Sequence, residues 1–200
     1  MAETSPPALD PATFLQEHVA PRSARRIAQL KGEIARLQRE LDDRLAAVAT
    51  VQLVLEGSGT WYLNLRDGET RVAGVPDSPP IVRLYQDRKD WELLLRAQLA
   101  GGAGLPTLAP ELTRSRIERL RTLDGSIAFR LGSDDGDRVV VVQFGSGERT
   151  EPRCTVSVRA EDALRLQARE LTPQAAFMQG LVRLEGDLAF AMQVGTALFL

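Results

Sequence analysis

The stretch FMQGLVRLEGD, residues 177–187, decides the fold of the C-terminal part of this chain. Thr172-Pro173 precedes it, a pair typical of a helix N-cap and the first helical position. Gly180 predicts the end of this short helix, and the alternation in VRLE predicts a short strand. Gly186 predicts a turn, and Asp187 predicts the N-cap of a last helix, LAFAMQVGTALFL. Because that helix is apolar almost all round, we expect it to be buried on several sides or to cover something apolar.

The composition narrows the class of protein. The chain has 200 residues, of which 44% are hydrophobic and 26% charged, as is ordinary for a globular protein. Its net charge of −2 gives no general attraction to nucleic acid or to an anionic membrane. The single cysteine, Cys154, excludes an intramolecular disulfide and offers no zinc-ligand spacing. The chain contains neither a signal peptide nor a membrane-spanning apolar run, so we expect a cytoplasmic protein without metal or cofactor.

Residues 1–48 predict a disordered leader followed by a helical arm. Asp10-Pro11 predicts a short helix that ends at Pro21, and a longer helix is expected from Ser23 to about Val48. Five apolar residues of the longer helix recur at spacings of three and four, which defines the seam Ile27, Leu30, Ile34, Leu37 and Leu41. Isoleucine at the a positions with leucine at d favours a parallel homodimer. The alternative is an amphipathic helix that lies on its own domain.

Two blocks of alternating apolar residues follow the arm and predict strands. The expected strands are 51–56, 61–66, 70–73 and 81–86 in the first block, and 126–131, 138–144 and 153–158 in the second, with helices after each block. Pro80 and Asp90 stand in the same frame as Pro152 and Asp162, 72 residues later, whereas the first strands match at about seventy-six. We interpret the blocks as a diverged internal duplication. The expected domains are 1–48, 49–105 and 111–200, with GGAGLPTLAP as a linker.

Residues that could carry out catalysis are few. The single histidine, His18, lies in the arm, far in sequence from any candidate partner. The acidic group at 134–137 lacks the spacing and the terminal glutamate of a calcium loop. Glu161 and Asp162 are explained by the dipole of the helix that they begin. We therefore expect no catalytic residues, no metal site and no enzyme activity.

The segment LTPQAAFMQGLVRLEGDLAFAMQVGTALF resembles the C-terminal signature of the sterol-carrier-protein type-two lipid-binding family. GTWYLNLRDG, residues 59–68, resembles the second strand and hairpin of that family, and the acidic helix starts after 81–86 and 153–158 also fit. The resemblance implies an α+β fold: an antiparallel or mixed five-stranded sheet covered by helices, here with a second related meander and the helical arm. Only the second meander carries the full signature, so we expect a complete lipid-binding unit at 111–200 and a partial one at 49–105.

The same resemblance implies non-catalytic binding or transfer of a lipid, such as a fatty acyl chain, an acyl-CoA, a sterol or an isoprenoid, in a hydrophobic tunnel. Inward strand positions and the last two helices supply its expected walls: Phe129, Val140, Val142, Val156, Phe177, Met178, Val182, Leu184, Leu188, Met192 and Phe199. The alternative function is a structural module that dimerises through the arm and docks on a partner protein or assembly. Each of these side chains could instead simply be part of a packed core.

Overall fold

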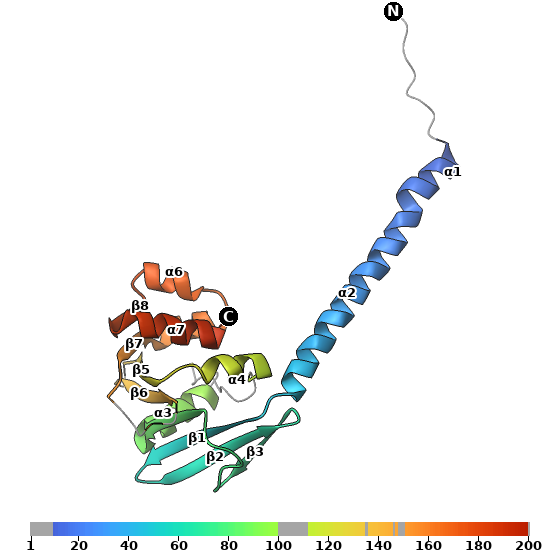
Figure 1. Ribbon diagram of the computed structural model, residues 1–200. Coiled ribbons are helices and arrows are strands. Elements are labelled where there is room, and N and C mark those ends of the chain that lie inside the picture. Colours follow the sequence, from blue (N-terminus) through green and yellow to red (C-terminus); the bar gives the residue numbers. More distant parts are fainter. Residues whose placement is uncertain (1–9, 100–111, 135, 146, 148–150, 200) are drawn as a thin grey trace, which may run out of the picture. The chain divides into compact units, whose positions relative to one another are not determined.

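The computed structural model in Figure 1 describes residues 10–99, 112–134, 136–145, 147 and 151–199, in two units, Met1–Asp42 and Asp43–Leu200. The predicted leader and the predicted linker lie outside the described residues. Among the described residues, no helix is both long and apolar enough to cross a membrane.

The first unit is helical. Its elements are α1 (Pro11–Phe14), the π-helical turn η1 (Leu15–Val19) and α2 (Ala20–Leu45). Asp10 is the N-cap as predicted, because its Oδ2 accepts a hydrogen bond from the Thr13 amide at 3.0 Å. The prediction that Pro21 ends a helix is wrong, since α2 continues through it. Proline removes one helical hydrogen bond, and the wider turn of η1 directly before it, where the Ala20 amide donates to the Leu15 carbonyl, is the local adjustment that accompanies it.

The second unit contains all eight strands expected from the alternating pattern. They are β1 (Ala49–Glu56), β2 (Gly59–Arg66), β3 (Glu69–Ala73), β4 (Val82–Asp87), β5 (Gly125–Gly132), β6 (Arg138–Phe144), β7 (Cys154–Arg159) and β8 (Val182–Gly186). They form one sheet of eight strands in the order β3-β2-β1-β4-β6-β5-β7-β8. The prediction of a five-stranded sheet is therefore wrong, although the mixed α+β class is confirmed.

The pairing of the strands repeats within the sheet. β1 pairs antiparallel with β2 and parallel with β4, and β5 pairs in the same way with β6 and β7. Val51 lies opposite Val82, and Ile127 lies opposite Cys154, so the partners are displaced by 76 and 72 residues. These are the offsets at which the two blocks match in sequence. A repeated topology thus accompanies the sequence repeat.

An antiparallel pairing of β4 with β6 joins the two halves, from Val82 opposite Phe144 to Gln86 opposite Val140. The Arg83 guanidinium adds a hydrogen bond of 2.6 Å to the Gly145 carbonyl. In the C-terminal half, the outer edge of β7 is covered by β8, and in the N-terminal half the equivalent edge of β4 is covered by β6. Likewise, β3 covers the outer edge of β2, and β4 covers the equivalent edge of β6. The sheet has eight strands because each half covers an edge that the other leaves free.

Among the described residues, five helices complete the second unit: α3 (Arg88–Leu99), α4 (Arg114–Leu120), α5 (Ala160–Gln167), α6 (Pro173–Met178) and α7 (Leu188–Phe199). α3 packs on β1, β4 and β6, α5 on β5 and β7, and α7 on β7, β8 and α4. The apolar sheet positions Val82 and Val142 share one buried core with Leu94 of α3, Ile117 of α4 and Phe190 of α7. These three helices therefore cover the same face of the sheet.

Candidate functional site

A groove of about 490 Å³ lies between α4 and α7. Its lining comes from these helices and from the turn that follows α4, and consists of Arg119, Thr122, Leu123, Met192, Gln193, Thr196 and Ala197. Leu123 and Ala197 also belong to the buried core, whereas Met192 is 62% exposed. The floor of the groove is therefore apolar, and its rim combines Met192 with polar side chains.

Two side chains fix the start of α4. Thr113 is its N-cap and accepts a hydrogen bond from the Arg116 amide at 3.2 Å. Asp43 accepts from the amide of Ser115 at 3.2 Å and from its hydroxyl at 2.9 Å. Burial acts to raise the pKa of Asp43, but the hydrogen bonds from Thr113 and Ser115 outweigh it and lower that pKa. Ile117 and Leu120 are buried beneath the helix, which leaves Arg119 at the groove.

Arg153, the residue just before β7, holds the N-cap residue at the start of α7 in place. The Oδ1 of Asp187 accepts a hydrogen bond from the Phe190 amide at 2.9 Å, and its Oδ2 pairs with the Arg153 guanidinium at 2.5 Å. That guanidinium also lies 4.4 Å from the centre of the Phe190 ring, within the range of a cation–π interaction. The Phe190 amide and Arg153 lower the pKa of Asp187. The N-cap predicted at Asp187 is confirmed.

Gly186 allows the close approach that this connection requires. Its φ is +97°, and a Cβ placed on it would lie 2.4 Å from the carbonyl oxygen of Arg153. Gly180, which ends α6, also has a positive φ of +71°, but a Cβ there would meet nothing within 4 Å. At Gly186, both the lack of space for a Cβ and the positive φ favour glycine, whereas at Gly180 only the positive φ does.

Polar side chains line one side of the groove. The Nε of Arg119 is buried and, among the described residues, has no hydrogen-bond partner. The hydroxyl of Thr122 donates to the Arg119 carbonyl at 2.8 Å, and that of Thr196 donates to the Met192 carbonyl at 2.9 Å. A guanidinium beside an apolar floor can hold an amphipathic molecule with an anionic end.

The expected wall residues on strands lie together. Phe129, Val140, Val142, Val156 and Leu184 share the helix-covered face of the sheet, and all of them belong to the core or pack against it. Val182 of β8 lies opposite Val158 of β7 and is half-buried. These positions are therefore packed beneath the helices rather than open to the groove.

The expected wall residues on helices lie elsewhere. Phe177 and Met178 were expected to face the interior, but they are 47% and 78% exposed, and Leu188 is 51% exposed. Ala176 is completely buried and takes the inward position of α6, so the next two residues turn away from the core at about 100° per residue. Met192 alone of the expected residues lines the groove. The side chain of Phe199 lies outside the described part of the structure.

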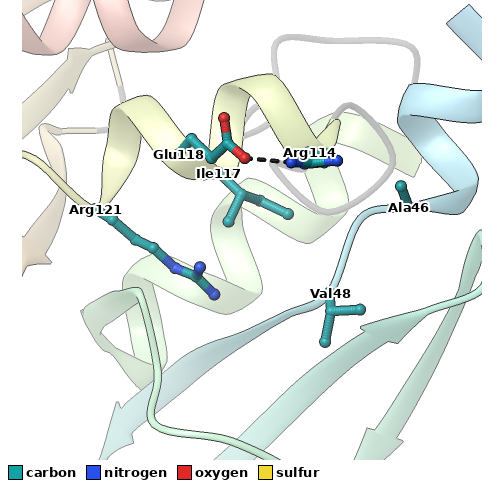
Figure 2. Close-up of a pocket in the computed structure, with 6 residues that line it drawn as sticks. All are labelled: Ala46, Val48, Arg114, Ile117, Glu118 and Arg121. Carbon is teal, nitrogen blue, oxygen red and sulfur yellow. Dashed lines mark hydrogen bonds and ion pairs between the residues drawn. The ribbon is translucent and has the colours of Figure 1, made fainter. Parts of the chain in front are cut away.

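A second, smaller pocket of about 160 Å³ lies beside the start of β1 (Figure 2). Ala46, Val48 and three residues of α4 line it, together with Arg121 just after that helix. An ion pair of 2.9 Å between Arg114 and Glu118 crosses it, so these two charges already satisfy each other. Figure 2 shows this pair beside the apolar side chains of Ile117 and Val48.

Cys154 is a buried free thiol. Burial raises the pKa of the Cys154 thiol, and the charge of Asp187 raises it further, so the thiol stays protonated at neutral pH. Among the described residues, no three histidine, cysteine, aspartate or glutamate side chains come close enough to hold a metal ion.

Most of the groove was not foreseen from the sequence. No role was predicted for Arg119, Thr122, Leu123, Gln193, Thr196 or Ala197. The pairing of α4 with α7 joins segments about seventy residues apart and leaves no periodic signal in the sequence. Arg119 was detectable only as one of four arginines between 114 and 121.

Replacing Gly186 by alanine should lower the free energy of unfolding by at least about 3 kcal/mol, because strain and overlap with the Arg153 carbonyl add together. The matched change Gly180→Ala should cost only about 1–2 kcal/mol, since it meets conformational strain without overlap. Urea unfolding followed by circular dichroism measures both. Equal losses would contradict the close approach at Gly186.

The variant Asp187→Asn should be less stable than the wild type at neutral pH, and the difference should shrink in acid. The folded-state pKa of Asp187 is lowered, so its contribution is complete above the unfolded value of about 3.9 and disappears as the pH falls through the folded value. Urea unfolding of both proteins between pH 7 and pH 2 measures this. Glu185→Gln serves as the control on β8, and a difference for Asp187→Asn that is independent of pH would contradict the ion pair.

Comparison with known proteins places this site in context. Residues 109–199 match the SCP-2 sterol transfer family. Curated proteins gave no match.

Three solved structures are similar to parts of the chain. The crystal structure of sterol carrier protein 2 like 2 from Aedes aegypti shares 21% identity over 55% of this chain and 96% of its own, with a TM-score of 0.34. The palmitated form of that protein shares 22% sequence identity, over 43% of this chain and 93% of its own, with a TM-score of 0.33. The sterol carrier protein domain 2 of Helicoverpa armigera shares 24% sequence identity, over 54% of this chain and 84% of its own, with a TM-score of 0.34. The signature around residues 177–187 thus falls within residues 109–199, the part of the chain that matches the SCP-2 sterol transfer family.

Proposed function

We propose that residues 43–200 bind or transfer an amphipathic lipid without catalysis, and that the groove between α4 and α7 holds it. The single observation that carries this proposal is an apolar floor, formed by Leu123 and Ala197, beside the unpartnered Nε of Arg119 among the described residues. The match of residues 109–199 to a sterol transfer family supports a lipid as the ligand. The volume of about 490 Å³ lies within the usual range of small-molecule sites.

The energetics are adequate for such binding. Covering on the order of 400 Å² of apolar lipid surface contributes roughly 10 kcal/mol. Association and ordering of the ligand oppose this by about 4 kcal/mol or more. The remainder of at most about 6 kcal/mol corresponds to a dissociation constant of about 40 μM or weaker. Shape and the anionic end would then determine selectivity.

A lipid is accommodated more easily in the groove than in a tunnel between α7 and the sheet. Phe190 and Val194 are buried under α7 in the core that contains Val142. A lipid lying between this helix and the sheet would have to displace these side chains. A lipid in the groove instead rests on Ala197, on the outer side of the same core. The residues Phe129, Val140, Val142, Val156 and Leu184 would then support the site from below.

Replacing Met192 by glutamate should weaken fatty-acid binding by about tenfold or more, because it places a negative charge against the lipid chain. The matched change Met178→Glu introduces the same charge at a position outside the groove and should leave affinity within about twofold. Titration with a fluorescent fatty acid measures both affinities. Native mass spectrometry after gentle purification shows whether the protein already carries lipid. Equal affinities for the two variants, or a lipid-free protein that ignores fatty acids, would reject the groove as the site.

The helical arm supports a second function, dimerisation, which would present the lipid-binding units as pairs or dock them on a partner protein. The five seam residues Ile27, Leu30, Ile34, Leu37 and Leu41 are 40% to 57% exposed on α2. A helix with such a stripe gains stability when a second helix covers it. Ile27 and Ile34 at a positions with Leu30 and Leu37 at d positions suit a second copy of this chain in parallel orientation.

Replacing Ile34 by lysine should convert the dimer into a monomer, because a charge at a central a position is costly to bury. The matched change Ala35→Lys adds the same charge one residue away, on the outer side of the helix, and should leave the dimer intact. Sedimentation equilibrium of the full chain measures both. A wild-type monomer, or an unchanged Ile34→Lys dimer, would exclude the seam as the interface.

A further inference from the structure

We propose that the N-terminal half of the sheet holds a second ligand site, in which Gln86 and Arg138 bind the anionic end of an amphipathic molecule and β1 to β3 support its apolar chain. This site is separate from the groove between α4 and α7 and does not depend on it. The ligand class is a chain of hydrocarbon ending in a carboxylate or a phosphate, both of which accept several hydrogen bonds.

Gln86 has an environment that does not suit its side chain. It is 2% exposed, and its pairing places it between Leu55 of β1 and Val140 of β6 on the helix-covered face. Neither the oxygen nor the nitrogen of its amide has a hydrogen-bond partner among the described residues. Burying an amide in this way is unfavourable unless something else supplies the missing bonds. In the C-terminal half, the position that corresponds to Gln86 is Val158.

Arg138 provides a charge next to this amide. It is 7% exposed, and its Nε is buried without a hydrogen-bond partner among the described residues. Arg138 stands two residues before Val140, the partner of Gln86, so the two side chains are diagonal neighbours on one face of the sheet. Such neighbours lie about 7–8 Å apart, a separation that one carboxylate or phosphate group can bridge. Amide and guanidinium donors together favour an anion over a neutral group.

Apolar side chains continue from Gln86 across the same face of the sheet towards its edge. Leu55 is its neighbour on β1, and two residues along the same face Leu53 lies opposite Trp61 of β2. Trp61 is 36% exposed, and Val72 at the edge of the sheet is 64% exposed. α3 packs above β1, β4 and β6 and forms the other wall, on which Trp91 is half-buried. The chain of an amphipath can therefore lie over β1 and β2 while its head reaches inward under α3.

The direction of the ligand follows from this arrangement. The unpartnered polar atoms are buried, and the apolar side chains become more exposed with distance from them. A polar head thus faces the interior and the tail lies towards the sheet edge. In the other half, Arg119 lines an open groove, although its Nε is buried as well, so the two sites differ in how far they enclose a ligand.

Tryptophan fluorescence tests this proposal directly, because the two tryptophans of the chain, Trp61 and Trp91, both lie in the N-terminal half. Titrating the full chain with dodecanoate or dodecyl phosphate should change the emission, and dodecanol should bind more weakly. A response to only one of the two anions identifies the head group. Gln86→Leu should weaken the anion response by about tenfold or more. Gln52→Leu, a half-buried glutamine on the opposite face, should leave it unchanged.

Arg138→Met gives an independent check, because it should reduce the preference for the anions over dodecanol while circular dichroism remains native. Met192→Glu should leave the tryptophan response intact, so failure of the groove and failure of this site are distinguishable. Unchanged anion binding in both Gln86→Leu and Arg138→Met, or no tryptophan response in the wild type, would overturn the proposal and indicate that these groups hold only water.

Discussion

The antiparallel pairing of β4 with β6 is the constraint on which residues 43–200 depend. Each of the two strands is the free edge of its own half, and an exposed edge leaves a row of unpaired backbone groups. Their pairing satisfies both edges at once, and the bond from Arg83 to the Gly145 carbonyl extends it beyond the ends of the strands. It also brings the apolar faces of both halves into one plane. α3, α4 and α7 can then share a single core, in which Val82 lies opposite Phe144 and Leu84 lies opposite Val142.

The two halves share backbone pairing but differ in how they are closed. The Arg153 amide donates to the Ser126 carbonyl, and at the corresponding place the Ile81 amide donates to the Thr50 carbonyl, each at 2.9 Å. The Arg153 side chain adds the ion pair with Asp187 and thereby fixes the start of α7. Isoleucine cannot make such a pair, and among the described residues no counterpart of β8 and α7 follows α3. The covering helix and the groove that it forms with α4 therefore belong to the C-terminal half.

The sequence predicted what repeats along the chain and missed what joins distant segments. Alternation located all eight strands, and the offsets of 72 and 76 residues reappear in the strand register. Periodicity tells which face a residue occupies but not which strand becomes its neighbour, so the pairing of β4 with β6 was not foreseen. Phe177 and Met178 were assigned inward from the family resemblance, because a helix as short as α6 has too few turns for its own sequence to set its phase. Arg119 was missed because its role arises from contact between α4 and α7.

Equivalent positions with different side chains explain how one repeated backbone could serve two purposes. On the helix-covered face, Gln86 occupies the place that Val158 occupies in the other half, so the polar group is buried in one half and absent from that position in the other. The C-terminal half instead keeps its guanidinium, Arg119, at the mouth of a groove whose floor is core. The amide of Gln86 is enclosed in the core between sheet and helices, whereas the groove lined by Arg119 is open to solvent, although the Nε of Arg119 is itself buried. The difference in enclosure, rather than in fold, is therefore what would make the halves select different ligands.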